Sequence, residues 1–203
     1  MPKNRLEAFS DGVIAIVITL LVLEIHVPQL PESVSSHDLI RMLLSLAPNF
    51  VAYIISFLVC AVWWVSHHNF IHDLKQVNRP LLWANNLFLL WLVFIPFPTA
   101  LLGQHPGQPV ATAFYGIICS LTGCSFWLMR RYASLHGELM KAEISDADRR
   151  HRVRVSMFSP LLYLVGAICS LALPTLAICI YAVIPAYFAI ANLAGAASSG
   201  TEE

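Results

Sequence analysis

The chain has 203 residues, of which 58% are hydrophobic and 12% charged, and its formal net charge is zero. A soluble domain carries about 25% charged residues, so this composition excludes an ordinary soluble protein. A neutral chain gives no support for a nucleic-acid partner, and we expect none. The apolar residues form long continuous runs, whereas the strands of a membrane β-barrel alternate apolar and polar residues. The sequence therefore favours a helical membrane protein.

Six apolar segments predict six transmembrane helices, and with them an all-α integral membrane protein. Each segment reaches the roughly 20 residues that a bilayer requires. We expect helices at 5–26, 46–68, 81–103, 108–131, 153–172 and 175–196, with a short interfacial helix at 37–45. Pro28, Pro80 and Pro174 lie at the breaks between them. These helices make up one transmembrane domain, 1–197, followed by a disordered tail, 198–203.

The beginning of the first helix also resembles a signal peptide, because Lys3 and Arg5 precede an apolar run. No small-residue cleavage site follows that run, so we expect the helix to be retained. With six spans, both chain ends lie on one side of the bilayer. That side receives eleven of the twelve Lys and Arg residues, and only Arg41 falls on the other. Positively charged loops stay in the cytoplasm, which predicts a multi-pass protein of the cell (inner) membrane with both termini cytoplasmic.

The first predicted helix holds polar residues at both ends. Arg5, Ser10 and Asp11 cluster at its inner end, and Glu24 lies at its outer end. Charge within a span is unfavourable unless it faces protein or water, so Asp11 should have a partner. Arg5 or a histidine of the second helix is the expected one.

Helical geometry places the large apolar residues of this helix on one side. At about 100° per residue, Ile16, Leu20 and Leu23 form a stripe with Thr19 at its edge. Asp11 points to nearly the opposite side. Spacing alone favours lipid contact or packing for such a stripe.

Arg5, Phe9, Ser10 and Asp11 stand in the pattern R-x-x-x-F-S-D. This pattern resembles the signature of the transmembrane-protein-175 family of potassium channels. The segments 64–70 (WVSHHNF), 85–87 (NNL) and 96–99 (PFPT) are also similar to that family, so the resemblance covers essentially the whole chain. Gly12 is one departure, since some members have alanine there. With one copy of the motif, the chain is similar to the prokaryotic, single-repeat members.

The resemblance implies a homotetramer in which the first helix of each subunit lines a pore for potassium. It implies an apolar constriction at Ile16, extended by Leu20 and Leu23, with the Thr19 hydroxyl beside it. No TVGYG-like filter is present, so we expect a leak-type conductance with modest preference for potassium over sodium. No cofactor is expected, and monovalent cations and the bilayer are the other partners.

Two kinds of role are expected for Glu24 and for the residues of the R-x-x-x-F-S-D pattern. Glu24 either concentrates cations at the outer mouth or lies at the headgroup level. Arg5, Phe9, Ser10 and Asp11 are expected to pack and to form hydrogen bonds between helices. The predicted partners of this signature cluster lie at the same end of the second helix, at His67, His68 and Asn69.

Two other functions compete with a channel. A secondary transporter is favoured by Pro96 and Pro98, which can break the third helix, but the chain shows no convincing internal repeat. A metal-dependent membrane enzyme is suggested by the i, i+4 spacing of His68 and His72, yet matching acidic or cysteine ligands are missing. We therefore expect no enzyme and no metal site. The five cysteines are expected to be small apolar residues.

Overall fold

The computed structural model describes residues 3–28 and 34–199, with side chains as far as Ile190, and all the regular structure in this part is helical. The first span is α1 (Lys3–Leu20), which continues as the 3-10 turn η1 (Leu21–Glu24). The elements that follow are α2 (Ser36–Ser45), α3 (Ala47–Asp73), α4 (Arg79–Val93), α5 (Pro96–Gln104), α6 (Pro109–Leu135), η2 (Gly137–Leu139), α7 (Asp146–Ser170) and α8 (Pro174–Ser199).

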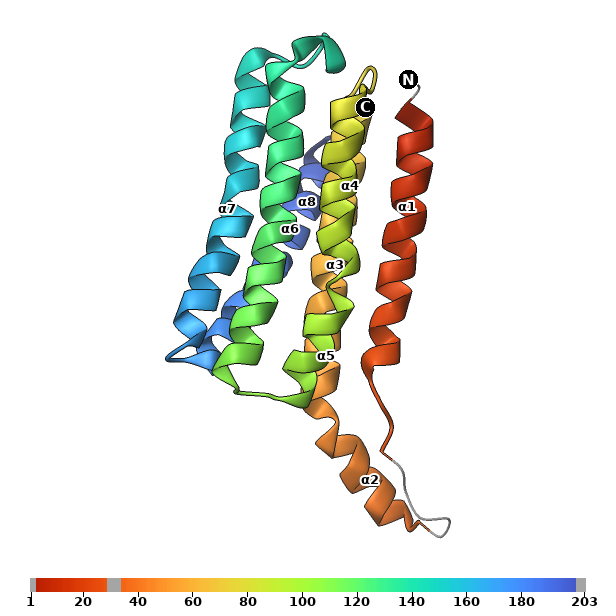
Figure 1. The fold of residues 1–203 in the computed structure, drawn as a ribbon, viewed down its shortest axis with the longest axis vertical. Helices are drawn as coiled ribbons and strands as arrows, with labels where there is room; N and C mark the ends of the chain where they lie inside the picture. Colours follow the sequence, from red (N-terminus) through yellow and green to blue (C-terminus); the bar gives the residue numbers. More distant parts are fainter. Residues whose placement is uncertain (1–2, 29–33, 200–203) are drawn as a thin grey trace.

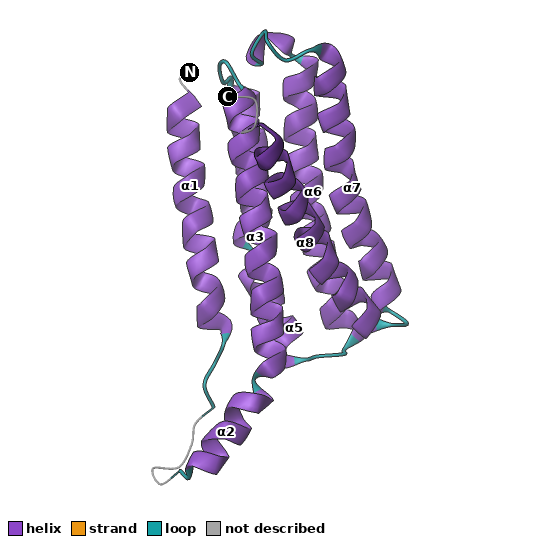
Figure 2. Ribbon diagram, turned by 180° about the vertical axis from the view of Figure 1, so that it is seen from behind, coloured by secondary structure: helices purple, strands orange, loops and turns teal. Residues whose placement is uncertain are grey.

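The long helices run side by side as one bundle, with α1 at an edge beside α3 and α4 and away from α6 and α7 (Figure 1). The short helix α2 projects from the far end of the bundle, as the view from behind also shows (Figure 2). The edge position of α1 decides the shape of the candidate site, because only one side of this helix packs against its own subunit.

Each of the six predicted spans coincides with helical structure. Within the described residues, five stretches are long and apolar enough to cross a bilayer: Lys3–Glu24, Ala47–Asp73, Arg79–Gln104, Pro109–Leu135 and Asp146–Ser170. The sixth predicted span lies in α8, which has 26 residues and is apolar over its described part, Pro174–Ile190. Of the predicted disordered tail, Ser198 and Ser199 lie in α8, while 200–203 lie outside the described residues.

Most predicted bounds differ from the structure by a few residues; the second helix ends at Asp73 rather than at 68, and the fourth at Leu135 rather than at 131. The first helix was expected to reach His26, but it tightens into η1 and ends at Glu24, with Ile25 in an extended conformation. The fifth helix begins at Asp146 rather than at 153. The Ser145 hydroxyl accepts a hydrogen bond from the Asp148 backbone N–H at 3.1 Å, which caps that start.

The third span is broken in its middle, between α4 and α5. Proline has no N–H to donate, and the helix resumes at Pro96. The break is fixed by hydroxyl groups: Thr99 Oγ1 lies 2.8 Å from the Ile95 carbonyl and 2.7 Å from Ser56 Oγ. Ser56 in turn lies 3.0 Å from the buried Tyr115 hydroxyl. Side chains of α3 and α6 thus stabilise the irregular backbone, as a membrane interior requires.

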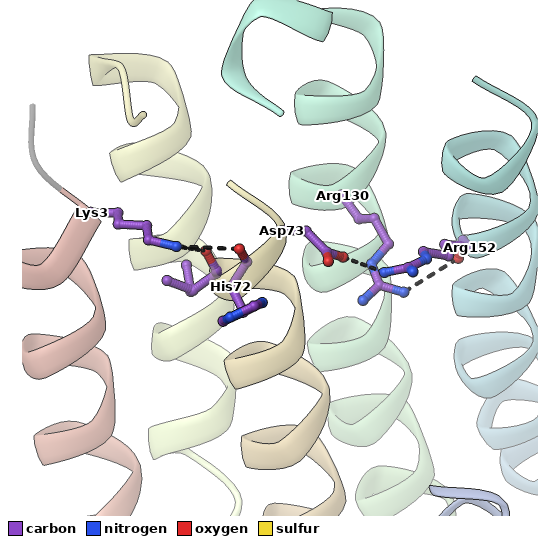
Figure 3. Close-up of polar contacts among 6 residues, drawn as sticks. Lys3, His72, Asp73, Arg130 and Arg152 are labelled. Carbon is purple, nitrogen blue, oxygen red and sulfur yellow. Dashed lines mark hydrogen bonds and ion pairs between the residues drawn. The ribbon is translucent and has the colours of Figure 1, made fainter. Parts of the chain in front are cut away.

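The N-terminal end of α1, the α3–α4 turn and the start of α7 lie at one end of the bundle, as does the end of α8 (Figure 1). Side chains connect three of these segments (Figure 3). Lys3 Nζ donates to the carbonyls of Ile71 and His72 at 3.3 and 3.2 Å. Asp73 pairs with Arg152 at 2.5 Å. Lys3 and Arg152 thus lie at the same end of the bundle.

Tyr181 of α8 occupies a slot between two glycines, Gly116 of α6 and Gly166 of α7. A Cβ atom added at either glycine would overlap the tyrosine ring. The Tyr181 hydroxyl donates to the Thr112 carbonyl at 3.2 Å. The slot therefore lets three helices approach closely around one fully buried aromatic side chain.

We expect Gly116→Ala to lower the stability of the folded subunit by about 1–3 kcal/mol, because Tyr181 must move to admit the new methyl group. Gly12→Ala is the matched control, since nothing lies within 4 Å of its added Cβ. Thermal unfolding of the purified protein in detergent checks this prediction. Equal melting temperatures for the two variants would show that the slot has room to relax.

Candidate functional site

The first helix has a buried side and an exposed side. The buried side follows the helical repeat and packs against the bundle through Leu6, Ser10, Ile14 and Val17, continued in η1 by Leu21. On the exposed side, the side chains of Ile16, Leu20 and Leu23 keep 59%, 39% and 66% of their surface accessible. The stripe predicted from the sequence thus faces away from the rest of the subunit.

We call Ile16, Thr19, Leu20 and Leu23 the α1 stripe. Thr19 is exposed beside Ile16, and its hydroxyl donates to the Ile16 carbonyl at 2.8 Å. That bond uses the hydroxyl hydrogen, and a lone pair of the oxygen can still accept a bond or face a cation. A continuous exposed apolar face of this kind contacts lipid, packs against another subunit or lines a pore.

The residues of the R-x-x-x-F-S-D pattern divide between the two sides of α1. Ser10 is fully buried, and Asp11 is half-buried. Arg5 and Phe9 are exposed, Phe9 with 56% of its surface accessible, and they lie on the same side as Ile16. Within the subunit, Ser10 and Asp11 form hydrogen bonds to side chains of α4 and α3. Positions 5, 9 and 16 fall within about 40° of one another on a helix, which is why they share a side.

A buried polar centre joins α1 to α3 and α4. Asn85 Nδ2 donates to Ser10 Oγ at 3.1 Å, and Asn85 Oδ1 lies 2.8 Å from His67 Nε2. All three side chains are fully buried. The His67 ring also stacks on Phe88, with ring centroids 5.5 Å apart. The predicted link between His67 and the first helix therefore exists, but Asn85 mediates it.

Two further contacts attach α1 to α3 nearer the surface. The Trp64 indole donates to Asp11 Oδ1 at 3.0 Å, and His68 Nδ1 lies 3.5 Å from Glu7 Oε1. Asp11 thus has a partner, as predicted, but the partner is neither Arg5 nor a histidine. Asn69 is exposed and borders a cavity on the opposite side of α3, away from α1.

The end of the candidate site that lies away from the N-terminus is formed by η1. Glu24 is partly buried, and its carbonyl lies 3.0 Å from His26 Nδ1. Within the described residues, no three His, Cys, Asp or Glu side chains come together as a metal site would require. His67 and His68 instead have different partners on different sides of α3.

Comparisons with known proteins agree with one another. The family model described as endosomal/lysosomal potassium channel TMEM175 matches residues 5–96. A potassium channel of Chamaesiphon minutus is 38% identical over 190 residues, which are 92% of this chain and 93% of that protein. A potassium channel of Chryseobacterium is 34% identical and covers 89% of each chain. The human endosomal/lysosomal proton channel TMEM175 is 35% identical over 115 residues, 54% of this chain and 23% of that protein.

This chain also shares its fold with solved structures. The crystal structure of a lysosomal potassium-selective channel TMEM175 homologue from Chamaesiphon minutus superimposes with a TM-score of 0.81 at 35% identity, covering 93% of this chain and 96% of the other. The crystal structure of a variant of the potassium channel MtTMEM175, in complex with a nanobody fusion protein, shares the fold at 18% identity and a TM-score of 0.58, covering 97% of this chain and 93% of the other.

Proposed function

Because the chain belongs to the TMEM175 family of potassium channels, we propose that it is a potassium-permeable, leak-type channel. Four copies assemble around a central axis, and α1 of each subunit lines the pore. The observation that carries this proposal is the exposed α1 stripe on a helix at the edge of the bundle. The stripe leaves an apolar face uncovered by its own subunit, and four such faces make a pore wall.

The constriction in this proposal is a ring of four Ile16 side chains, continued outward by Leu20 and Leu23. Narrow apolar rings control conduction by dewetting, because an ion that passes must lose water without gaining other ligands. Potassium loses its hydration shell more readily than sodium, which gives a modest preference for potassium. Thr19 supplies the nearest oxygen atoms, and Glu24 raises the local cation concentration at the outer mouth.

The orientation we propose has both termini in the cytoplasm, in the cell (inner) membrane of a prokaryote. The basic end of the bundle, with Lys3 and Arg152, then faces the cytoplasm, as positively charged loops do. The whole segment 1–197 acts as one channel domain.

Reversal potentials in proteoliposomes test this function. Under a potassium gradient, the current should reverse near the potassium equilibrium potential and shift when sodium or caesium replaces potassium on one side. The relatives from vertebrates carry the name of proton channels, so the same vesicles are measured under a pH gradient at equal potassium. Current that follows only the pH gradient would mean that the permeant ion is the proton and not potassium. Absence of current under every gradient would contradict a channel.

A secondary transporter is the second candidate, and the break between α4 and α5 favours it. Discontinuous helices form the substrate sites of many transporters. Here Thr99, Ser56 and Tyr115 satisfy one another at the break. Uptake of a solute that requires a second ion gradient would support this candidate, whereas passive current that obeys the reversal potential would not.

We expect Asp11→Ala to reduce the yield of tetramer, because it removes the carboxylate that fixes α1 against Trp64 of α3. Asp11→Asn is the matched control, since its amide oxygen can still accept the indole hydrogen bond. Size-exclusion chromatography with light scattering gives the oligomeric state. A normal tetramer yield for Asp11→Ala would show that the Asp11–Trp64 bond has no part in assembly.

A further inference from the structure

A cavity of about 250 Å³ lies between α3, α6, α7 and α8, and no residue of α1 borders it. Its apolar wall is formed by side chains from all four helices: Val59, Trp63, Phe126, Tyr163, Ile184 and Phe188. The cavity is therefore separate from the α1 stripe, and nothing in the proposed pore accounts for it.

Two guanidinium groups form the other wall of this cavity. Arg152 pairs with Asp73, while Arg130 donates to the Arg152 carbonyl at 3.5 Å (Figure 3). The Arg130 guanidinium also lies over the Phe126 ring, 5.1 Å from its centroid. Among the ion pairs of the described residues, Arg130 has no carboxylate partner. Asp73 therefore compensates the charge of Arg152 alone, and the positive charge of Arg130 remains unpaired beside an apolar cavity.

The charged and apolar walls follow one another along the helix axis. Arg152 lies near the start of α7, and Tyr163 follows it by eleven residues. At 1.5 Å per residue this separation is about 16 Å. Arg130 lies near the end of α6, at the same end of the bundle as Asp73. A ligand that fits has an anionic group at the basic end of the bundle and an apolar chain that points toward the middle of the membrane.

We propose that this cavity binds an anionic phospholipid, with its phosphate at Arg130 and Arg152 and part of one acyl chain among the apolar side chains. Arginine suits a phosphate because its planar guanidinium can donate two parallel hydrogen bonds. Basic pockets between transmembrane helices at the cytoplasmic surface are the usual place for such headgroups. The aromatic ring under Arg130 keeps the guanidinium in place without neutralising its charge.

Native mass spectrometry of the full-length protein in detergent tests this proposal, with phosphatidylglycerol and phosphatidylcholine as the two probes. The wild type should retain phosphatidylglycerol about tenfold more tightly than phosphatidylcholine, and Arg130→Gln should lose that preference. Arg131→Gln is the matched control, because Arg131 stacks on Trp127 and does not border the cavity. This variant should bind as the wild type does.

Two further measurements distinguish the contribution of the lipid headgroup to binding from that of the acyl chain. Val62→Trp fills the cavity while both arginines remain, and it should also lose bound phosphatidylglycerol. Glycerol phosphate, which has no acyl chain, should not displace the lipid; displacement would show a phosphate site that needs no lipid and would overturn the proposal. Arg130→Lys preserves the charge and should retain part of the preference. If Arg130→Gln does not fold, Val62→Trp is the variant that must lose the bound lipid. Equal retention of both lipids by the wild type would also overturn the proposal. The measurement needs no ion current, so its outcome is independent of the proposed function.

Discussion

Replacing Ile16 by asparagine should raise the conductance about tenfold and remove most of the preference for potassium over sodium. An amide at the narrowest ring gives water and ions hydrogen-bonding partners where the aliphatic side chain offers none. A tenfold rise corresponds to about 1.4 kcal/mol less barrier at the ring. Single-channel recordings in planar bilayers, with potassium on one side and sodium on the other, measure both quantities.

Ile168→Asn is the matched control for this experiment. Ile168 is also an isoleucine of a predicted span, 63% exposed, but it lies on α7, away from α1. The same chemical change there should leave conductance and selectivity as in the wild type. Unchanged currents in Ile16→Asn would contradict the pore assignment of the α1 stripe, and this helix face would then be a surface for lipid or for another subunit.

The neighbours of Ile16 should show graded effects in the same recordings. Leu20 is less exposed than Ile16 because it lies closer to the buried side of α1. Thr19→Val keeps the size of the side chain and removes its oxygen, so it tests whether the hydroxyl contributes to selectivity. We expect a smaller loss of selectivity for Thr19→Val than for Ile16→Asn, because the Thr19 hydroxyl already donates to the Ile16 carbonyl.

Hydropathy predicted where the helices lie but not where they end. The segment 146–152 is mostly charged, so an apolar window excluded it from the fifth helix. A helix outside the bilayer needs only a cap and satisfied backbone groups, and Ser145 supplies the cap. The opposite holds at 25–26, which the prediction counted as the end of the first helix although the backbone has already left the helix there. Helix length and span length are different quantities, and hydropathy reports the second.

The sequence predicted the side of α1 that carries the stripe, because a single helix has a known angle per residue. It did not predict which side chain of another helix reaches it. Asn85 was visible as a polar residue in an apolar run, but only the packing of α4 against α1 places its amide between Ser10 and His67. The same angular argument would have placed Arg5 and Phe9 beside Ile16, had it been extended toward the N-terminal end of the helix.

Replacing Asn85 by alanine should destabilise the subunit by about 1–3 kcal/mol. The change leaves His67 Nε2 and Ser10 Oγ without their shared partner, and both atoms belong to fully buried side chains. Hydrogen bonds between membrane helices are individually weak, about 0.6 kcal/mol on average, so the larger part of the effect comes from the groups left unpaired. Asn86→Ala is the matched control, because Asn86 follows directly in α4 and is exposed. Thermal unfolding in detergent measures the difference.

The Asn85 centre also determines which way α1 faces. A turn of about 100° about its own axis would move Ser10 out of the core and carry Ile16 away from the exposed side. Ser10 and Asn85 oppose that turn, since both lose a buried hydrogen bond when α1 rotates, and the bond to His67 holds the Asn85 amide in place. We therefore expect channels that still assemble with Asn85→Ala to show variable conductance, with several current levels where the wild type has one. A single, wild-type level in this variant would mean that apolar packing of Ile14 and Val17 alone holds the orientation of α1.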